Sequence, residues 1–222
     1  MIKTNDTWRE IDWNEALASA AEALKRSSAE KVGVLASPSV TVEEAHLLAR
    51  VADHLGTANI DHRISRRDFS DQPNDPLFPW LGCDIADIEK KNAVFVVGSK
   101  IRGEAPIRAH RLRKAALAGA DISFANSKSH EYFFEVHTQL SGSGLVGLLS
   151  GVAVAAAGAT ALPSSVASLC KGVNASDEQI AIAASLKSAD ESLVLLGGIA
   201  TSHLAHKAVT ALTACIADLT AS

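Results

Sequence analysis

The spacing of apolar and polar residues changes repeatedly along the chain between a helical and a strand pattern. Apolar residues recur at helical spacing after two capping-box pairs, Asp12 with Glu15 and Thr41 with Glu44. Short apolar runs rich in β-branched residues stand between the helical stretches and predict strands. The expected strands cover residues 31–36, 58–60, 93–97, 121–124 and 193–196. This alternation predicts an α/β fold with a mostly parallel sheet and helices on both of its faces.

Further helices are marked by their ends. Pro106 suits the first turn of a helix and Gly119 suits its C-terminal cap. Ser176 with Gln179 forms a third capping pair, and residues 202–219 form the last expected helix.

The segment from Val136 to Cys170 contains no Asp, Glu, Lys or Arg. Within it, residues 144–162 are long enough to span a bilayer. They are mostly Ala and Gly, however, and neither a Lys or Arg cluster nor an aromatic belt flanks them. We therefore expect a buried helix and no membrane insertion. We also expect this charge-free segment to supply the main apolar patch that a longer protein would cover.

Composition narrows the function classes. The 222 residues carry a net charge of −4, so no overall basic field favours nucleic-acid binding. The three cysteines lie far apart and form no CxxC pair, which indicates free thiols in a reducing compartment. Iron–sulfur clusters usually take four thiolates, so we expect none held by this chain alone.

A Gly-Ser turn follows the most apolar strand, at residues 98 and 99. Ligands of open α/β sheets bind beyond such strand ends, and backbone N–H groups there suit a phosphate. The candidate cofactor-binding residues are Gly98, Ser99, Lys100 and Arg102. The segment lacks both GxGxxG and the P-loop pattern, so an ordinary turn is the competing interpretation.

A second candidate is the charged loop between residues 61 and 71. Its carboxylates could act as acid and base, or they could pair with its arginines and order the loop. We favour the paired structural loop, whose residues are Asp61, Arg63, Arg66, Arg67 and Asp68. We assign no catalytic residue. We also assign no metal site, because His203 and His206 have no third ligand nearby in sequence.

Several segments in order also carry a resemblance, among them "SPSVTVEEAHLLARVADHLGTANIDHR", "NAVFVVGSKIRGEAPIRAHRLRKAALAGADISFAN" and "LLGGIATSHLAHKAV". They resemble the molybdopterin-oxidoreductase-like region of the large iron–sulfur subunits of NADH-quinone oxidoreductase, the bacterial respiratory complex I. The resemblance implies a fold like that of formate dehydrogenase and dimethyl sulfoxide reductase. It implies a fragment of a larger subunit, with one α/β region divisible into lobes of about 1–130 and 131–222.

The resemblance also implies a setting. The full-length subunit would hold iron–sulfur clusters on cysteine motifs outside this sequence and would carry electrons from NADH toward quinone. Its partners would be other subunits of the complex. The subunit itself would lie on the cytoplasmic side of the bacterial inner membrane, peripheral to the membrane.

Two departures from the family pattern bear on the cofactor. In formate-dehydrogenase-like relatives a loop matching residues 59–68 carries the metal-ligating Cys or selenocysteine, and Arg67 stands there. A guanidinium has no free lone pair for a metal. Lys100 stands where the pterin-nucleotide turn usually has Asn.

Three interpretations remain. The first is a structural and assembly domain, with no cofactor and no activity of its own. The second is a molybdopterin-guanine-dinucleotide-binding domain of a molybdenum oxidoreductase. The third is a general nucleotide-binding α/β module. The departures at Arg67 and Lys100 favour the first.

Overall fold

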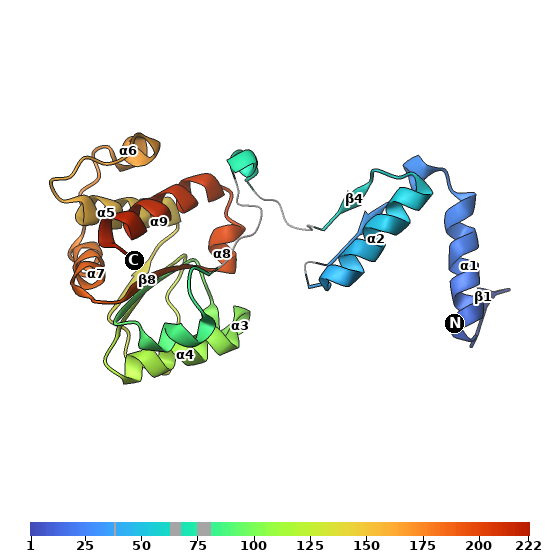
Figure 1. Cartoon of the computed structure of the whole chain (residues 1–222), viewed down its shortest axis with the longest axis horizontal. Coiled ribbons are helices and arrows are strands. Elements are labelled where there is room, and N and C mark those ends of the chain that lie inside the picture. The colour runs from blue at the N-terminus through green and yellow to red at the C-terminus, as the bar shows by residue number, and fades with distance from the viewer. Residues whose placement is uncertain (38, 63–67, 75–80) are drawn as a thin grey trace. The chain divides into compact units, whose positions relative to one another are not determined.

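The computed structural model describes residues 1–37, 39–62, 68–74 and 81–222 (Figure 1). The chain divides into two compact units, Met1–Ser65 and Arg66–Ser222. We call them unit 1 and unit 2 and describe each by itself.

Unit 1 combines two helices with two small two-stranded sheets. Strands β1 and β2 pair antiparallel, and β3 and β4 pair parallel. In chain order the elements are β1 (Ile2–Thr4), β2 (Thr7–Arg9), α1 (Trp13–Arg26), η1 (Ala29–Lys31), β3 (Val34–Leu35), α2 (Val42–Leu55) and β4 (Ile60–Asp61).

The helix ends of unit 1 follow the sequence signals. Thr41 and Glu44 form the expected reciprocal capping box at the start of α2. Asp12 caps α1 through the backbone N–H of Glu15 at 2.8 Å. The Glu15 side chain pairs with Arg9 and does not complete a capping box there.

Unit 1 buries little of its own apolar surface. Among its described residues only Val32, Ala52 and Thr57 are buried, and α1 buries none. Trp13 and Leu17, on the apolar face of α1, are 81% and 62% exposed. No other described element of unit 1 covers this face.

Unit 2 is built on a four-stranded parallel sheet in the order β7-β6-β5-β8. Its elements are η2 (Gln72–Asn74), η3 (Ile85–Lys90), β5 (Ala93–Val97), α3 (Ile101–Glu104), α4 (Pro106–Leu117), β6 (Asp121–Asn126), β7 (Thr138–Ser141), α5 (Leu145–Ala157), α6 (Ser164–Cys170), α7 (Asp177–Ser188), β8 (Ser192–Leu196), α8 (Gly198–Thr201) and α9 (His206–Thr220).

The sheet confirms the α/β class and corrects the expected strand set. The strands expected at 31–36 and 58–60 pair with each other in unit 1, outside the main sheet. Strand β7 was not predicted, because "TQLS" is polar and short and gives no apolar run. The lobe boundary expected near residue 130 falls inside unit 2, where β6 and β7 are hydrogen-bonded neighbours.

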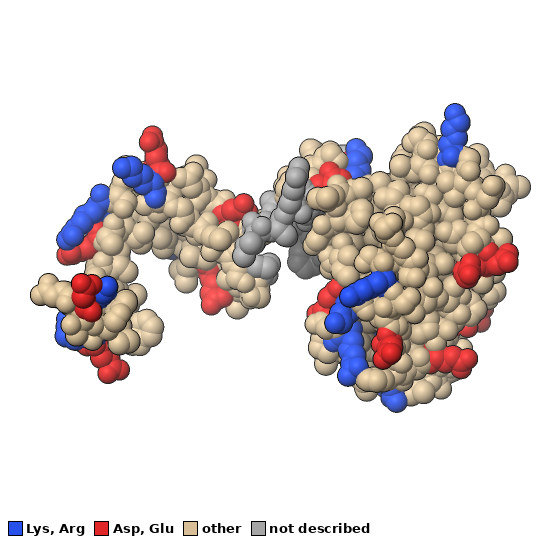
Figure 2. Space-filling view, turned by 180° about the vertical axis from the view of Figure 1, so that it is seen from behind, with Lys and Arg blue, Asp and Glu red and all other residues tan. Residues whose placement is uncertain are grey.

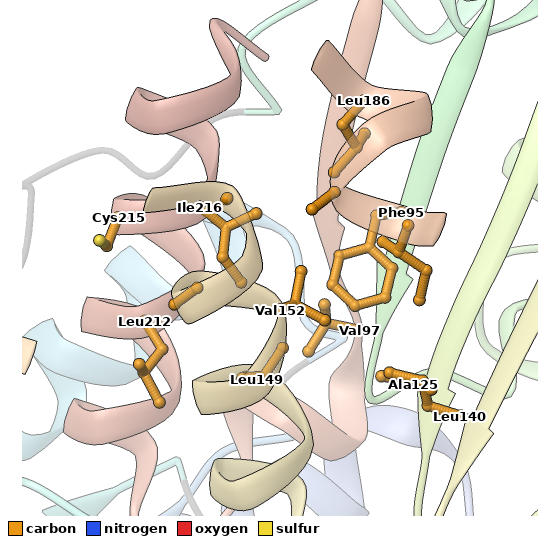
Figure 3. Close-up of a cluster of buried hydrophobic side chains, with 14 of the residues drawn as sticks. Phe95, Val97, Ala125, Leu140, Leu149, Val152, Leu186, Leu212, Cys215 and Ile216 are labelled. Carbon is orange, nitrogen blue, oxygen red and sulfur yellow. The ribbon is translucent and has the colours of Figure 1, made fainter. Parts of the chain in front are cut away.

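The core of unit 2 has two layers, one on each face of the sheet. All five residues of β5 are buried, and alternate side chains point to opposite faces. Phe95 and Val97 pack with α5, α7 and α9, as Figure 3 shows in part. Val94 and Val96 pack with η3 and α4 on the other face.

Helix α5 is part of this core, as expected for a buried helix. Leu149, Val152 and Ala153 are fully buried. The expectation that the charge-free segment forms the main exposed apolar patch is therefore wrong, because the sheet and α9 cover it. Within the described parts of the chain, no helix is both long and apolar enough to cross a membrane.

Candidate functional site

The carboxyl ends of β5 and β8 meet at the place where parallel sheets usually bind ligands. The chain leaves β5 to build β6 and β7 on one side and returns to place β8 on the other. Such a reversal of strand order opens a crevice beyond the strand ends in many α/β proteins. The sequence candidates Gly98 and Ser99 follow β5 directly at this point.

In this protein, backbone packing fills the space between the turns after β5 and β8, and an open hollow of about 660 Å³ lies beside them, lined in part by Glu104, Gly198 and His203. The N–H of Gly197 donates to the carbonyl of Val97 at 2.8 Å, and the N–H of Ala200 donates to the carbonyl of Gly98 at 3.0 Å. Gly98 has φ +59°, and a Cβ there would lie 2.6 Å from the nitrogen of Ala200. A Cβ on Gly197 would lie 2.6 Å from the carbonyl oxygen of Gly98. Only glycine allows the two turns to approach this closely.

Three hydrogen-bond donors at the crevice point to a carboxylate of the same chain. Glu104 Oε2 accepts from the Ser99 hydroxyl at 2.8 Å and from the Gly198 N–H at 2.9 Å. Glu104 Oε1 accepts from the Lys100 N–H at 2.9 Å. Glu104 thus takes the position in which backbone donors would hold a phosphate.

The structure separates the four sequence candidates. Gly98 and Ser99 are buried in the turn, and Asn126 Oδ1 accepts from the Ser99 N–H at 2.8 Å. Lys100 and Arg102 are exposed, and the Arg102 guanidinium lies 4.0 Å from the centroid of the Phe133 ring. The four residues therefore form no single binding surface.

Glu104 and Asn126 were not singled out from the sequence. Glu104 lies in the "GEAP" segment, and Asn126 ends a strand. Neither belongs to a motif with a defined spacing, and their partners come together only when β5, β6 and β8 align.

Of the charged loop, the structure describes Asp61 and Asp68, and the arginines at 63, 66 and 67 lie outside the described residues. Asp61, in unit 1, accepts from the His62 N–H at 2.7 Å. The expected arginine–carboxylate pairing therefore stays a prediction, as does the role of Arg67.

Asp68 does have a structural partner, in unit 2. Its carboxylate accepts from the Ser70 N–H at 3.0 Å and from the Lys207 N–H at 3.1 Å. Lys207 lies in the first turn of α9, whose own N-cap residue, Ala205, offers no side-chain acceptor. Hydrogen bonds from Ser70 and then from Lys207 lower the Asp68 pKa to about 2.

The two histidines do not lie on one helix, although both fall within the helix expected at residues 202–219. Helix α9 begins at His206, whereas His203 precedes it, and His203 Nδ1 accepts from the Ala205 N–H at 3.0 Å. In the described ranges, no three His, Cys, Asp or Glu side chains lie together in a metal-binding arrangement.

Comparison with known proteins places this fold in a family. The profile of the molybdopterin oxidoreductase family matches residues 1–222. The chain is 28% identical over 119 residues to the G subunit of the NADH-quinone oxidoreductase of Rickettsia felis. It is 24% identical over 136 residues to the protein of the same name from Rickettsia typhi.

These matches cover 54% and 61% of this chain. They cover only 17% and 20% of the two Rickettsia proteins. The chain therefore matches about a fifth of the length of these curated relatives.

Proposed function

Because the chain belongs to the molybdopterin oxidoreductase family, we propose that it is a structural and assembly domain of a NADH-quinone oxidoreductase subunit like those of the two Rickettsia species. In this role it binds no cofactor and performs no electron transfer of its own. The complete subunit carries iron–sulfur clusters and passes electrons from NADH toward quinone. It lies peripherally on the cytoplasmic side of the bacterial inner membrane, as part of the membrane-bound complex.

The observation that carries this proposal is the position of the Glu104 carboxylate. The family implies a pterin cofactor with phosphate groups at the strand ends. Here the Ser99 hydroxyl and the N–H groups of Lys100 and Gly198 already bind Glu104. A phosphate would have to displace a carboxylate that repels it, and the Gly98–Gly197 contact leaves no gap between the turns. These contacts support a role without the cofactor.

The assembly role draws on unit 1. Its helix α1 presents Trp13 and Leu17 without cover from any described element of the same unit. Contiguous exposed apolar side chains of this kind mark surfaces that another body covers. We assign the covering body to other parts of the same assembly.

The alternative is a domain that binds molybdopterin guanine dinucleotide, and GDP is a direct probe for it. Calorimetric titration of the wild-type chain with GDP should give no binding heat. A one-to-one complex that is weakened by Lys100→Glu and unchanged by the distant Lys187→Glu would overturn the scaffold role in favour of the alternative.

A further inference from the structure

Unit 2 has another recess, which aromatic and cationic side chains line. It lies between helix α4 and the segment that connects β6 to β7, and its volume is about 230 Å³. Pro106, Ala109, His110 and Arg113 line one side of it. These residues recur at spacings of three and four, so a single face of α4 forms that side. We call this recess the α4 cleft.

The opposite side of the α4 cleft is an aromatic wall. Tyr132, Phe133 and Phe134 line it. Tyr132 stacks on the fully buried Phe124, with ring centroids 4.0 Å apart and planes 17° apart. Burial raises the Tyr132 pKa to about 12. Tyr132 is therefore held against the sheet before any ligand arrives, whereas Phe133 is 65% exposed.

The rim of the α4 cleft is cationic. Arg102 stacks on Phe133, and Arg113 lies one helical turn beyond the imidazole of His110. Within the described parts of the chain, neither arginine forms an ion pair. Elsewhere on the same helix, Arg111 and Lys114 are both paired with Glu89. Figure 2 shows one region of unit 2 in which Lys and Arg side chains gather.

We propose that the α4 cleft is a docking site for an acidic segment of a partner protein, with one apolar side chain inserted against Tyr132 and carboxylates paired with Arg102 and Arg113. The recess is smaller than the roughly 300–1,000 Å³ of most small-molecule sites, and a single side chain suits it better than a dinucleotide. A small inorganic anion would leave the aromatic wall unused. Arginine and aromatic side chains are also the residues that dominate binding energy at protein interfaces.

This inference stands on unit 2 alone and goes beyond the scaffold role. A short peptide, acetyl-Glu-Asp-Phe-Asp-Glu-amide, carries the required charge and anchor. Tyr132 is the only tyrosine of the chain, so selective ¹³C-tyrosine labelling gives one NMR reporter inside the α4 cleft. Titration with the peptide should shift the Tyr132 ring signals to saturation, and added salt should weaken the binding.

Matched peptides test the apolar anchor and the acidic charges of the proposal separately. Replacing Phe by Ala in the peptide should weaken binding about tenfold or more, because the apolar anchor is lost. A cationic peptide with the same Phe should leave the signals in place. An equal response to the cationic peptide would overturn the proposal, as would unchanged Tyr132 signals throughout the acidic titration. Signals that respond to GDP and not to the acidic peptide would also overturn it.

Matched variants of the protein test whether the acidic peptide binds in the α4 cleft. The double variant Arg102→Glu/Arg113→Glu should lose at least about tenfold in affinity for the acidic peptide. The double variant Arg108→Glu/Lys187→Glu changes the net charge by the same amount outside the lining of the cleft, and it should bind like the wild type at high salt. Equal losses in both variants would contradict docking in the α4 cleft. The peptide comparisons on the wild-type chain decide the question even if the Arg102→Glu/Arg113→Glu variant does not fold.

Discussion

The Glu104 carboxylate accepts a hydrogen bond from the backbone N–H of Gly198 at 2.9 Å, across 94 positions of sequence. Glu104 ends α3, which follows β5, and Gly198 begins α8, which follows β8. The Glu104 side chain therefore joins α3 to α8, the two helices that follow the neighbouring strands β5 and β8. We call this contact at the strand ends a structural junction.

Removal of this carboxylate should weaken unit 2. Glu104→Ala removes the acceptor of the part-buried Ser99 hydroxyl and of the exposed N–H groups of Lys100 and Gly198, at a cost of about 0.5–1.5 kcal/mol in the free energy of unfolding. Glu104→Gln keeps one acceptor oxygen and should lose less. Urea unfolding measures both, with the exposed Glu131→Ala as control. If Glu104→Ala unfolds at the same urea concentration as Glu131→Ala, the junction contributes nothing.

Two glycines of α5 should respond oppositely to alanine. A Cβ on Gly147 meets nothing within 4 Å, so Gly147→Ala should stabilise the helix by about 0.5–1 kcal/mol. A Cβ on Gly151 would overlap the Gln179 carboxamide, which donates to the Leu148 carbonyl at 3.0 Å and accepts from the Ser176 N–H at 2.8 Å. Gly151→Ala should destabilise by about 1–3 kcal/mol.

Thermal unfolding of the two α5 variants checks this contrast. Gln179→Ala combined with Gly151→Ala should recover part of the loss, because the overlapping group is gone. A similar midpoint for both single variants would show that α5 and α7 do not pack as closely as described.

The hydrogen bonds of Asp68 predict a pH dependence. Its folded pKa of about 2 lies below the ordinary value of 3.8, so the carboxylate stabilises unit 2 above pH 3.8. That contribution should fade as the pH falls through 3.8 toward 2. Unfolding midpoints of the wild type and Asp68→Ala should therefore differ at pH 6 and converge near pH 2. If the difference between the two midpoints stays constant from pH 6 to pH 2, the ionised Asp68 carboxylate does not stabilise the start of α9.

The apolar face of α1 gives a prediction about assembly. Leu17→Glu changes an exposed residue, so it should alter the stability of the chain by less than about 0.5 kcal/mol. Introduced into the protein in its own cells, it should lower the amount of assembled NADH-quinone oxidoreductase on native gels. Ser19→Glu places the same charge about 200° around the helix and should assemble normally. Equal assembly of both variants would remove α1 from the interface.

Much of the fold could be predicted because its signals are local. The capping boxes at Thr41 and Ser176 and the helix start at Pro106 depend on neighbours in sequence, and the structure confirms all three. The continuous apolar runs likewise gave β5, β6 and β8.

The missed features depend on contacts between distant residues. The polar strand β7 exists because β6 offers it a free edge. Ala205 cannot cap α9, and Asp68 supplies the acceptor from 139 positions away. The amphipathic pattern of α1 predicted a helix correctly, but no sequence pattern tells whether its apolar face is covered within the same unit.

The central claim is that this member of the molybdopterin oxidoreductase family holds no pterin cofactor. The most direct measurement is molybdenum, tungsten and released guanine nucleotide per mole of protein, after purification from cells that make the cofactor. The junction at Glu104 predicts amounts far below one per chain, equal to those of a purified unrelated protein. Molybdenum or tungsten together with guanine nucleotide at one per chain would contradict the account.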